Sequence, residues 1–246
     1  MKTKSFLFVL CSLFLLTACN CPQGGLTITT DTIPVNATAD AIADQAYTEY
    51  LAPTKHIMDS IMGEVLGYAP ERMYVADEEC PMLNWAADAL LDAARKKCPK
   101  HVDIALLNRG GTRCNWAAGE ITRGHVFKMM PFDNKMVVVT LKGQDLLDLF
   151  TFLAKGNAQG IAGMRVKFVN KELAEITVGG KPVDPKATYR VATNSYLAKG
   201  KDGMTALTVD KKPWDSGLLI RDIYIDAVRK QGTVRAAIDG RMVIEK

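Results

Sequence analysis

Six residues near the middle of the chain, Met-Val-Val-Val-Thr-Leu at 136–141, most constrain the fold that it can adopt. β-Branched residues dominate this run, and they fit the half-buried surface of a sheet better than a helix. A glycine follows closely, and residues 143–153 then place leucine and phenylalanine at the three- and four-residue spacing of a one-sided helix. The sequence therefore predicts a buried strand that leads directly into an amphipathic helix.

The same two patterns recur along the rest of the chain. Further strands are predicted at residues 102–107, 164–169, 174–178 and 189–193. Helices are predicted at residues 39–50, 54–66, 83–97 and 217–230. Strands and helices alternate irregularly, so we expect an α/β domain with a mixed sheet (α+β) rather than a repeated βαβ unit.

Turn and cap residues predict where several elements begin and end. Pro53 should end the first helix, Gly67 the second and Gly232 the last. Asp215 or Ser216 is the expected cap of that last helix. The adjacent glycines at 179–180 predict a tight hairpin turn.

The first residues predict an export signal. Lys2 and Lys4 form a basic head, residues 6–16 an apolar run, and residues 16–19 a small-residue cleavage box that ends at Cys19. The box resembles a bacterial lipobox, which implies that Cys19 is lipidated and that the protein is anchored at the cell envelope, on the outer membrane or its periplasmic face. An uncleaved anchor or an ordinary secretory peptide would explain the same residues.

We expect residues 1–18 to be a signal peptide, 19–39 a flexible stalk and 40–246 a single domain. The stalk is inferred from its glycine, threonine, proline and asparagine, which follow no clear period. About 200 residues remain, which suffice for one core. Without the two signal lysines the formal charge falls from +4 to about +2. That balance does not indicate a nucleic-acid partner.

The cysteines and histidines follow no pattern of a metal or catalytic site. The cysteines beyond the signal and Cys19 are scattered, and no pairing can be read from them: Cys21, Cys80, Cys98 and Cys114. A dinuclear metal hydrolase needs several clustered carboxylate, imidazole and amide ligands. His56, His101 and His125 lie outside such motifs. We therefore expect no catalytic residue, metal or cofactor in this chain.

Residues 108–113, Asn-Arg-Gly-Gly-Thr-Arg, form a polar elbow after the strand predicted at 102–107. Two adjacent glycines let a ligand approach the backbone amides closely. Arg113 offers a planar fork of donors that suits a phosphate or carboxylate. Thr122 is a candidate N-cap for the helix that follows. A tight turn, a surface arginine and a capped helix would also explain these residues.

Two further loops carry candidate binding residues. Phe132 and Asn134 lie in a Pro-Phe-Asp-Asn turn, where the ring could stack on an aromatic ligand and the amide could contact its edge. Tyr196 and Asp202 lie in the loop after the strand predicted at 189–193. The Asp202 carboxylate could accept hydrogen bonds from sugar hydroxyls. Core packing of Phe132 and an ordinary turn at Asp202 are the structural alternatives.

The order of these stretches resembles the C-terminal domain of the 5′-nucleotidase family. The segments that carry the resemblance are "NRGGTR" at 108–113, "GEITRGHVFKMMPFDN" at 119–134, "VVVTLKGQDLLDLF" at 137–150 and "VGGKPVDPKATYRVATNSYLAKGKDG" at 178–203. The resemblance implies a layered α/β/β/α domain, preceded here by N-terminal helices. In that family this domain binds the nucleoside, and an N-terminal metallophosphatase half supplies two metal ions and a catalytic Asp-His pair. Divalent metals are thus expected only in a partner metallophosphatase.

Residue by residue, the resemblance implies a nucleotide clamp. Arg113 matches the arginine of the family's Asn-X-Gly-Gly-Ile-Arg motif and would face the phosphate or ribose. Phe132 and Tyr196 would stack on the two faces of the base, and Asn134 would contact its edge. Asp202 matches an aspartate that holds ribose hydroxyls.

Two positions match the family only loosely and two depart from it. Arg72 corresponds loosely to another family arginine, and Gly160 to a backbone contact. Asp133 replaces the glycine of Pro-Phe-Gly-Asn, and Lys201 a glycine of Gly-Gly-Asp-Gly. Both departures place the local backbone in question, because glycine can adopt conformations that other residues avoid.

Three functions remain in competition. The first is a surface lipoprotein that forms the nucleotide-binding half of a split 5′-nucleotidase, inactive alone and working with a separately encoded metallophosphatase. The second is a non-catalytic protein that captures nucleotides or nucleosides at the cell surface. The third is a degenerate domain kept for protein contact, which the departures at Asp133 and Lys201 favour.

Overall fold

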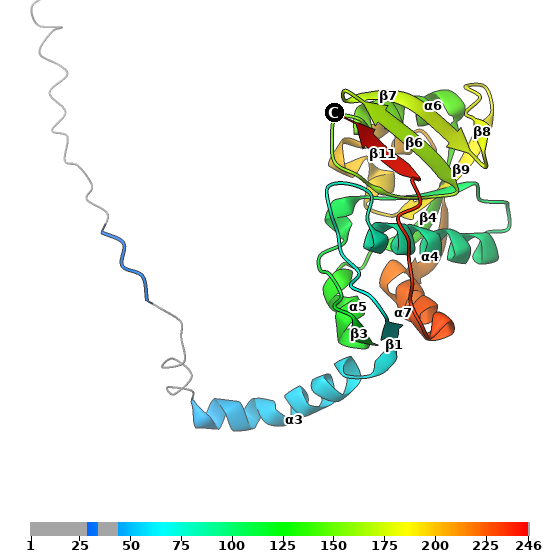
Figure 1. Cartoon of the computed structure of the whole chain (residues 1–246). Helices are drawn as coiled ribbons and strands as arrows, with labels where there is room; N and C mark the ends of the chain where they lie inside the picture. The colour runs from blue at the N-terminus through cyan, green and yellow to red at the C-terminus, as the bar shows by residue number, and fades with distance from the viewer. Residues whose placement is uncertain (1–28, 34–43, 246) are drawn as a thin grey trace, which may run out of the picture. The chain divides into compact units, whose positions relative to one another are not determined.

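The computed structural model describes residues 29–33 and 44–245 (Figure 1). The predicted signal peptide, Cys19 and most of the predicted stalk lie outside the described residues. The chain divides into two units, Met1–Tyr50 and Leu51–Lys246. All of the sheets and the candidate site belong to the second unit.

The N-terminal helices differ from the prediction. One helix, α3 (Gln45–Met62), replaces the two that were expected, and Pro53 lies inside it. Proline removes one backbone donor from a helix but does not always end it. Gly67 is also not a helix stop, because it lies in strand β1 (Val65–Ala69). A Cβ at Gly67 would lie 2.7 Å from the carbonyl oxygen of Gly232, so a close backbone contact explains this glycine.

A five-stranded sheet forms the centre of the second unit. Its strands, in the order β10-β4-β9-β2-β5, are β10 (Trp214–Leu219), β4 (Lys135–Lys142), β9 (Thr188–Asn194), β2 (Ile104–Leu107) and β5 (Gly160–Ala162). Strands β2 and β9 run parallel, and the other neighbours are antiparallel. The sheet is therefore mixed, as the sequence predicted.

Two smaller sheets complete the strands. A four-stranded sheet has the order β11-β6-β7-β8, with β11 (Met242–Glu245), β6 (Met164–Val169), β7 (Glu172–Val178) and β8 (Lys181–Pro182). The glycines at 179 and 180 both have positive φ in the turn between β7 and β8, which confirms the predicted hairpin turn. Strand β1 pairs with β3 (Gly119–Thr122).

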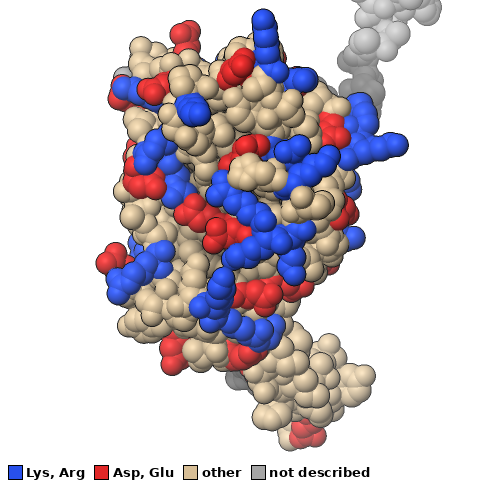
Figure 2. All heavy atoms as spheres, turned by 90° about the vertical axis from the view of Figure 1, so that its right-hand side faces the viewer, with Lys and Arg blue, Asp and Glu red and all other residues tan. Residues whose placement is uncertain are grey.

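Helices α4 (Pro81–Lys97) and α6 (Gly143–Leu153) cover opposite faces of the central sheet. Helix α7 (Ile220–Gln231) packs on β10 and α4, and the short α5 (Arg123–Met129) packs on β3 and α7. Helix α4 packs on β2 and β5 and also contacts α7, while α6 packs on β4, β9 and β7 (Figure 1). Lysine and arginine are interleaved with acidic residues on the face that Figure 2 shows.

The packing of β2 shows why its sequence is a continuous apolar run. Ala105 and Leu107 join one hydrophobic cluster with α4 and α7, and Ile104 and Leu106 join a second with α6 and the four-stranded sheet. A strand that is buried on both faces needs apolar residues at every position. The layered α/β class predicted from the sequence is confirmed.

The last helix begins later than predicted. Asp215 and Ser216 do not cap it, because both lie in β10, where Trp214 pairs with Val138 of β4. Helix α7 starts only at Ile220, and Gly232 ends it with φ of 65°, as predicted. The Thr122 hydroxyl accepts a hydrogen bond from the backbone N–H of His125, which confirms the predicted cap of α5.

Within residues 29–33 and 44–245, no helix has the length and hydropathy that crossing a bilayer requires. Cys80, Cys98 and Cys114 carry free thiols. Cys80 is buried, and the other two are half-buried.

The junction of β4 and α6 yields a test of the packing. A Cβ on Gly143 would lie 1.9 Å from the carbonyl oxygen of Asp184. We predict that Gly143→Ala lowers the free energy of unfolding by about 1–3 kcal/mol, because the turn at 184–187 must move. Urea unfolding measures this loss. Gly156→Ala is the control, since its Cβ would approach only the Leu153 carbonyl oxygen, at 3.6 Å; equal stability of the two variants would contradict the prediction.

Candidate functional site

The site lies where two parallel strands end side by side. Asn108 directly follows β2, and Asn194 is the last residue of β9. Because β2 and β9 are parallel neighbours, their carboxyl ends reach the same edge of the sheet. Asn108 is 8% exposed and Asn194 is 2% exposed. Buried amides of this kind need hydrogen-bond partners.

Four side chains at this edge form a connected polar ladder: Asn194, Asn108, Asp202 and Tyr196. The Asn194 Nδ2 donates to Asn108 Oδ1 at 3.2 Å, and the Asn108 Nδ2 donates to Asp202 Oδ2 at 2.7 Å. The Tyr196 hydroxyl donates to Asp202 Oδ1 at 2.8 Å. This last hydrogen bond raises the pKa of Tyr196 above its usual value, because loss of the proton would remove the bond and put a second negative charge beside the carboxylate.

The elbow itself has room for Asn108 only because of a glycine. A Cβ at Gly111 would lie 2.9 Å from the Asn108 Oδ1. Residues 109–111 form the short 3-10 helix η1 (Arg109–Gly111), which turns the chain away from the sheet. Gly111 thus allows the asparagine side chain to fold back toward Asn194, whereas a Cβ at Gly110 would make only an ordinary contact with it, at 3.7 Å.

Asp202 has an unusual backbone conformation. Its φ is 54°, in the left-handed region, and it lies in the short 3-10 helix η3 (Lys201–Gly203). Gly200 and Gly203 have φ of 75° and 76°. A non-glycine residue in this region is uncommon and is often found at functional sites. Lys201, which replaces a family glycine, does not have positive φ.

Phe132 and Asn134 reach the same place from the loop between α5 and β4. Phe132 is half-buried against the cluster under α4 and α7. The guanidinium carbon of Arg113 lies 5.2 Å from the centroid of the Phe132 ring, a cation–π distance. Asp133 has no positive φ, and its carboxylate pairs with Arg221 at 2.8 Å. Asp133 therefore needs none of the conformations that are reserved for glycine.

Five of the predicted residues line one cavity of about 250 Å³. They are Arg113, Phe132, Asn134, Tyr196 and Asp202. Asn108 and the elbow glycines complete its wall. The cavity thus brings together two aromatic rings, an amide, a carboxylate and a guanidinium. This set suits a ligand in which a flat heterocycle is joined to a part with hydroxyl groups and a negative charge.

The two loosely matched residues lie elsewhere. Arg72 lines a separate cavity of about 520 Å³ together with Arg235, and its guanidinium carbon lies 5.8 Å from the Tyr74 ring centroid. Gly160 is buried in β5, where a Cβ would lie 3.1 Å from the Leu83 carbonyl oxygen. The structure does not bring either residue to the cavity of Phe132 and Tyr196.

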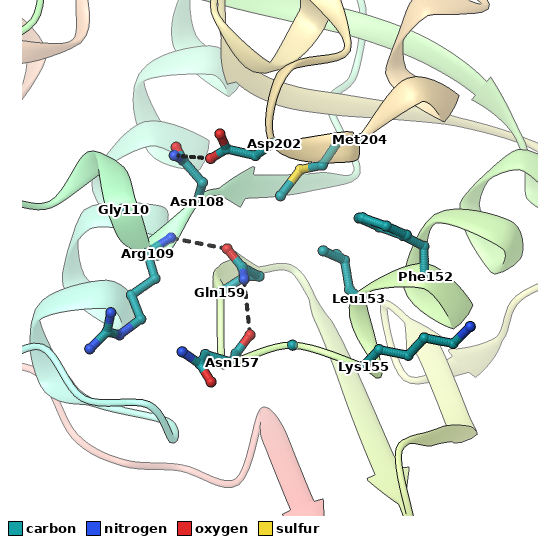
Figure 3. Close-up of a pocket in the computed structure, with 11 residues that line it drawn as sticks. Asn108, Arg109, Gly110, Phe152, Leu153, Lys155, Asn157, Gln159, Asp202 and Met204 are labelled. Atoms are coloured by element: carbon teal, nitrogen blue, oxygen red, sulfur yellow. Dashed lines mark hydrogen bonds between the residues drawn. The ribbon is translucent and has the colours of Figure 1, made fainter. Parts of the chain in front are cut away.

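A second cavity of about 410 Å³ adjoins the first (Figure 3). Both cavities are lined by Asn108, Gly110 and Asp202. The remaining wall of the second comes from the C-terminal end of α6, the turn after it and Met204.

Sequence reasoning did not identify the two ladder asparagines as site residues. Each stands at the carboxyl end of an apolar strand, and this placement is the signal that could have found them. No sequence pattern pointed to the wall from α6, because Phe152 and Gln159 look like ordinary helix and turn residues. In the part of the chain that the structure describes, no three His, Cys, Asp or Glu side chains are grouped to hold a metal ion.

Several known proteins are similar to this chain. A 5′-nucleotidase from Vibrio cholerae is 28% identical over 188 residues, which are 72% of this chain and 33% of that protein. The trifunctional nucleotide phosphoesterase YfkN of Bacillus subtilis is 28% identical over 210 residues, 76% of this chain and 14% of that protein. The chain thus spans a third or less of these curated relatives.

Solved structures share the fold. The 5′-nucleotidase precursor of Thermus thermophilus matches with a TM-score of 0.73 and 27% identity, over 84% of this chain and 44% of that one. The NAD nucleotidase of Haemophilus influenzae matches with a TM-score of 0.66 and 20% identity, over 82% and 41% of the two chains. The model of the 5′-nucleotidase C-terminal domain family matches residues 62–209, which include the elbow and both loops of the cavity. The chain therefore belongs to the 5′-nucleotidase C-terminal domain family.

Proposed function

We propose that this chain is the nucleotide- or nucleoside-binding half of a split 5′-nucleotidase. The observation that carries the proposal is the meeting of five residues in one cavity, namely Arg113, Phe132, Asn134, Tyr196 and Asp202. They come from three separate parts of the chain, and they are five of the seven residues that the family resemblance assigns to the ligand; the two loosely matched ones, Arg72 and Gly160, lie elsewhere. The similarity to a 5′-nucleotidase and to a nucleotide phosphoesterase supports a nucleotide as the ligand.

Each part of a nucleotide would find a partner of suitable chemistry. The base would stack between Phe132 and Tyr196, and Asn134 would offer both a donor and an acceptor to its edge. Asp202 would accept from the ribose hydroxyls, since a carboxylate has about four acceptor positions and the ladder uses two of them. Arg113, exposed at the rim, would face the phosphate with its planar fork of donors.

Hydrolysis would take place on a second polypeptide. We propose a separately encoded metallophosphatase whose divalent metal ions would activate a water molecule for attack on the phosphate ester that this chain presents, releasing phosphate and the nucleoside. Residues of this chain would bind and orient the nucleotide, which lowers the entropic cost of the reaction. Export and a lipid on Cys19 would hold the pair at the bacterial cell envelope.

Binding of AMP tests the clamp. We predict that the purified domain binds AMP in titration calorimetry and that Phe132→Ala weakens binding by about 5- to 150-fold, the value of one stacked base. Tyr196→Phe keeps the ring but loses the hydroxyl, so it should cost less than Tyr196→Ala. Val209→Ala, an exposed apolar residue outside the cavity, is the control. Absence of AMP binding by the wild-type domain would refute the nucleotide assignment.

Partnership with a phosphatase has its own test. We predict that adding this domain to an exported metallophosphatase from the same source increases its rate of AMP hydrolysis, because the bound nucleotide is presented in one orientation. The Phe132→Ala variant should lose most of this gain, while Val209→Ala should keep it. AMP binding without any gain in rate would favour the alternative, a non-catalytic surface protein that captures nucleotides.

The anchor is tested in cells. We predict that the full chain partitions into the membrane fraction and is labelled by a radioactive fatty acid, because Cys19 carries the lipid. Cys19→Ser should abolish both the label and the partitioning, whereas Cys98→Ser should change neither. A Cys19→Ser protein that still carries label would contradict lipidation at this residue.

A further inference from the structure

The cavity that holds the clamp is small and continues into a larger one. Ligand pockets usually enclose about 300–1,000 Å³. The clamp cavity measures about 250 Å³, and the adjoining second cavity measures about 410 Å³. Asn108, Gly110 and Asp202 line both, so one carboxylate stands at the boundary. A ligand that is bound at Asp202 therefore has space on two sides.

The walls of the second cavity combine an apolar side with an amide side. Figure 3 shows Phe152, Leu153 and Met204 on one side of it. Asn108 and Gln159 lie across from them. Aromatic surface accepts a flat ring, and amides offer both donors and acceptors to the edge of such a ring.

Phe152 is the most unusual part of this wall. Its side chain is 47% exposed, whereas Phe150 and Phe168 are buried. A Cβ on Gly203 would lie 2.5 Å from the Phe152 Cζ, so the ring lies directly against the glycine that follows Asp202. The structure thus holds an exposed ring in the same cavity as the carboxylate that the proposed function assigns to ribose.

The amide side is held in place by hydrogen bonds. The backbone N–H of Arg109 donates to Gln159 Oε1 at 3.0 Å, and Gln159 Nε2 donates to the Asn157 carbonyl oxygen at 2.9 Å. The Arg109 guanidinium is turned outward, where it donates to the Ala76 carbonyl oxygen and pairs with Asp77. The elbow and the turn after α6 are therefore held together by the protein's own hydrogen bonds. Lys155 also lines the cavity.

We propose that the second cavity is a subsite for a second ring, joined to the nucleotide through the 3′ oxygen of its ribose. This inference rests on the proposed function, which puts the ribose hydroxyls at Asp202. The free 2′ hydroxyl still donates to Asp202, and the group attached to the 3′ oxygen leaves the clamp at the boundary and enters the second cavity. The second ring stacks on Phe152 and contacts the amides of Gln159 and Asn157. The ligand class is a 5′-phosphorylated dinucleotide with a 3′–5′ linkage.

Three ligands separate the contributions to binding. AMP occupies the clamp alone, adenosine 3′,5′-bisphosphate adds a phosphate without a ring, and 5′-phosphorylated diadenylate adds both. In calorimetry with the whole domain, we expect the dinucleotide to bind about 5- to 150-fold more tightly than AMP, as one further stacked base allows. The bisphosphate should bind with nearly the affinity of AMP. If the bisphosphate shows the whole gain, the cavity takes a phosphate and the ring subsite is wrong.

Two substitutions locate the gain. Phe152→Ala should reduce the affinity for the dinucleotide to that for AMP and leave AMP binding unchanged, while Phe132→Ala should weaken both ligands by the same factor. Phe152→Leu keeps the apolar wall without an aromatic face and should retain part of the gain. Equal loss of both ligands in Phe152→Ala would overturn the subsite.

The wild-type protein separates failure of the subsite from failure of the proposed function. Binding of AMP with no preference for the dinucleotide overturns only the subsite. If neither ligand binds, both proposals fall together.

Discussion

The hydrogen bond between Asn108 and Asn194 is the interaction on which the rest of the site depends. It joins the carboxyl ends of β2 and β9, which are neighbouring inner strands of the sheet, and both side chains are buried. From this pair, one amide reaches Asp202 and the other accepts from the backbone N–H of Leu197. A buried amide that loses its partner costs about 1–3 kcal/mol, so the pair fixes both loops as well as the strands. The positions of Asp202 and Tyr196 thus follow from the topology of the sheet.

Much of the fold was predictable because the spacing of apolar residues within the strongest helices and strands is enough to identify them. The bounds of α6 and β6 agree with the prediction, and the closing glycine of α7 was identified as its stop. The errors occur where distant pairing decides the structure. The polar residues of β10 resemble a helix cap in the sequence, but their pairing with β4 makes them part of a strand. Gly67 resembles a helix stop, but the close approach of the end of α7 is what requires a glycine there.

The site shows the same division. Residues with distinctive chemistry, such as Arg113 and Phe132, could be found from short motifs and a family resemblance, and the structure brings them together. The side chains that position them could not be found in this way. Asn108 and Asn194 are 86 residues apart in the sequence, and nothing local reveals that they meet. The sequence does not reveal the role of Phe152 for a similar reason. Its ring becomes part of the wall of the second cavity only because the distant Gly203 lies against it.

The contact between Arg113 and Phe132 joins two loops that β3 and α5 separate in the sequence. The guanidinium carbon lies 5.2 Å from the centroid of a ring that is itself half-buried against the core. A cation–π contact at an exposed site contributes about 0.5–1 kcal/mol, so it ties the end of the elbow to the turn that carries Phe132. Removal of Arg113 would therefore loosen this turn as well as remove the charge at the rim of the cavity.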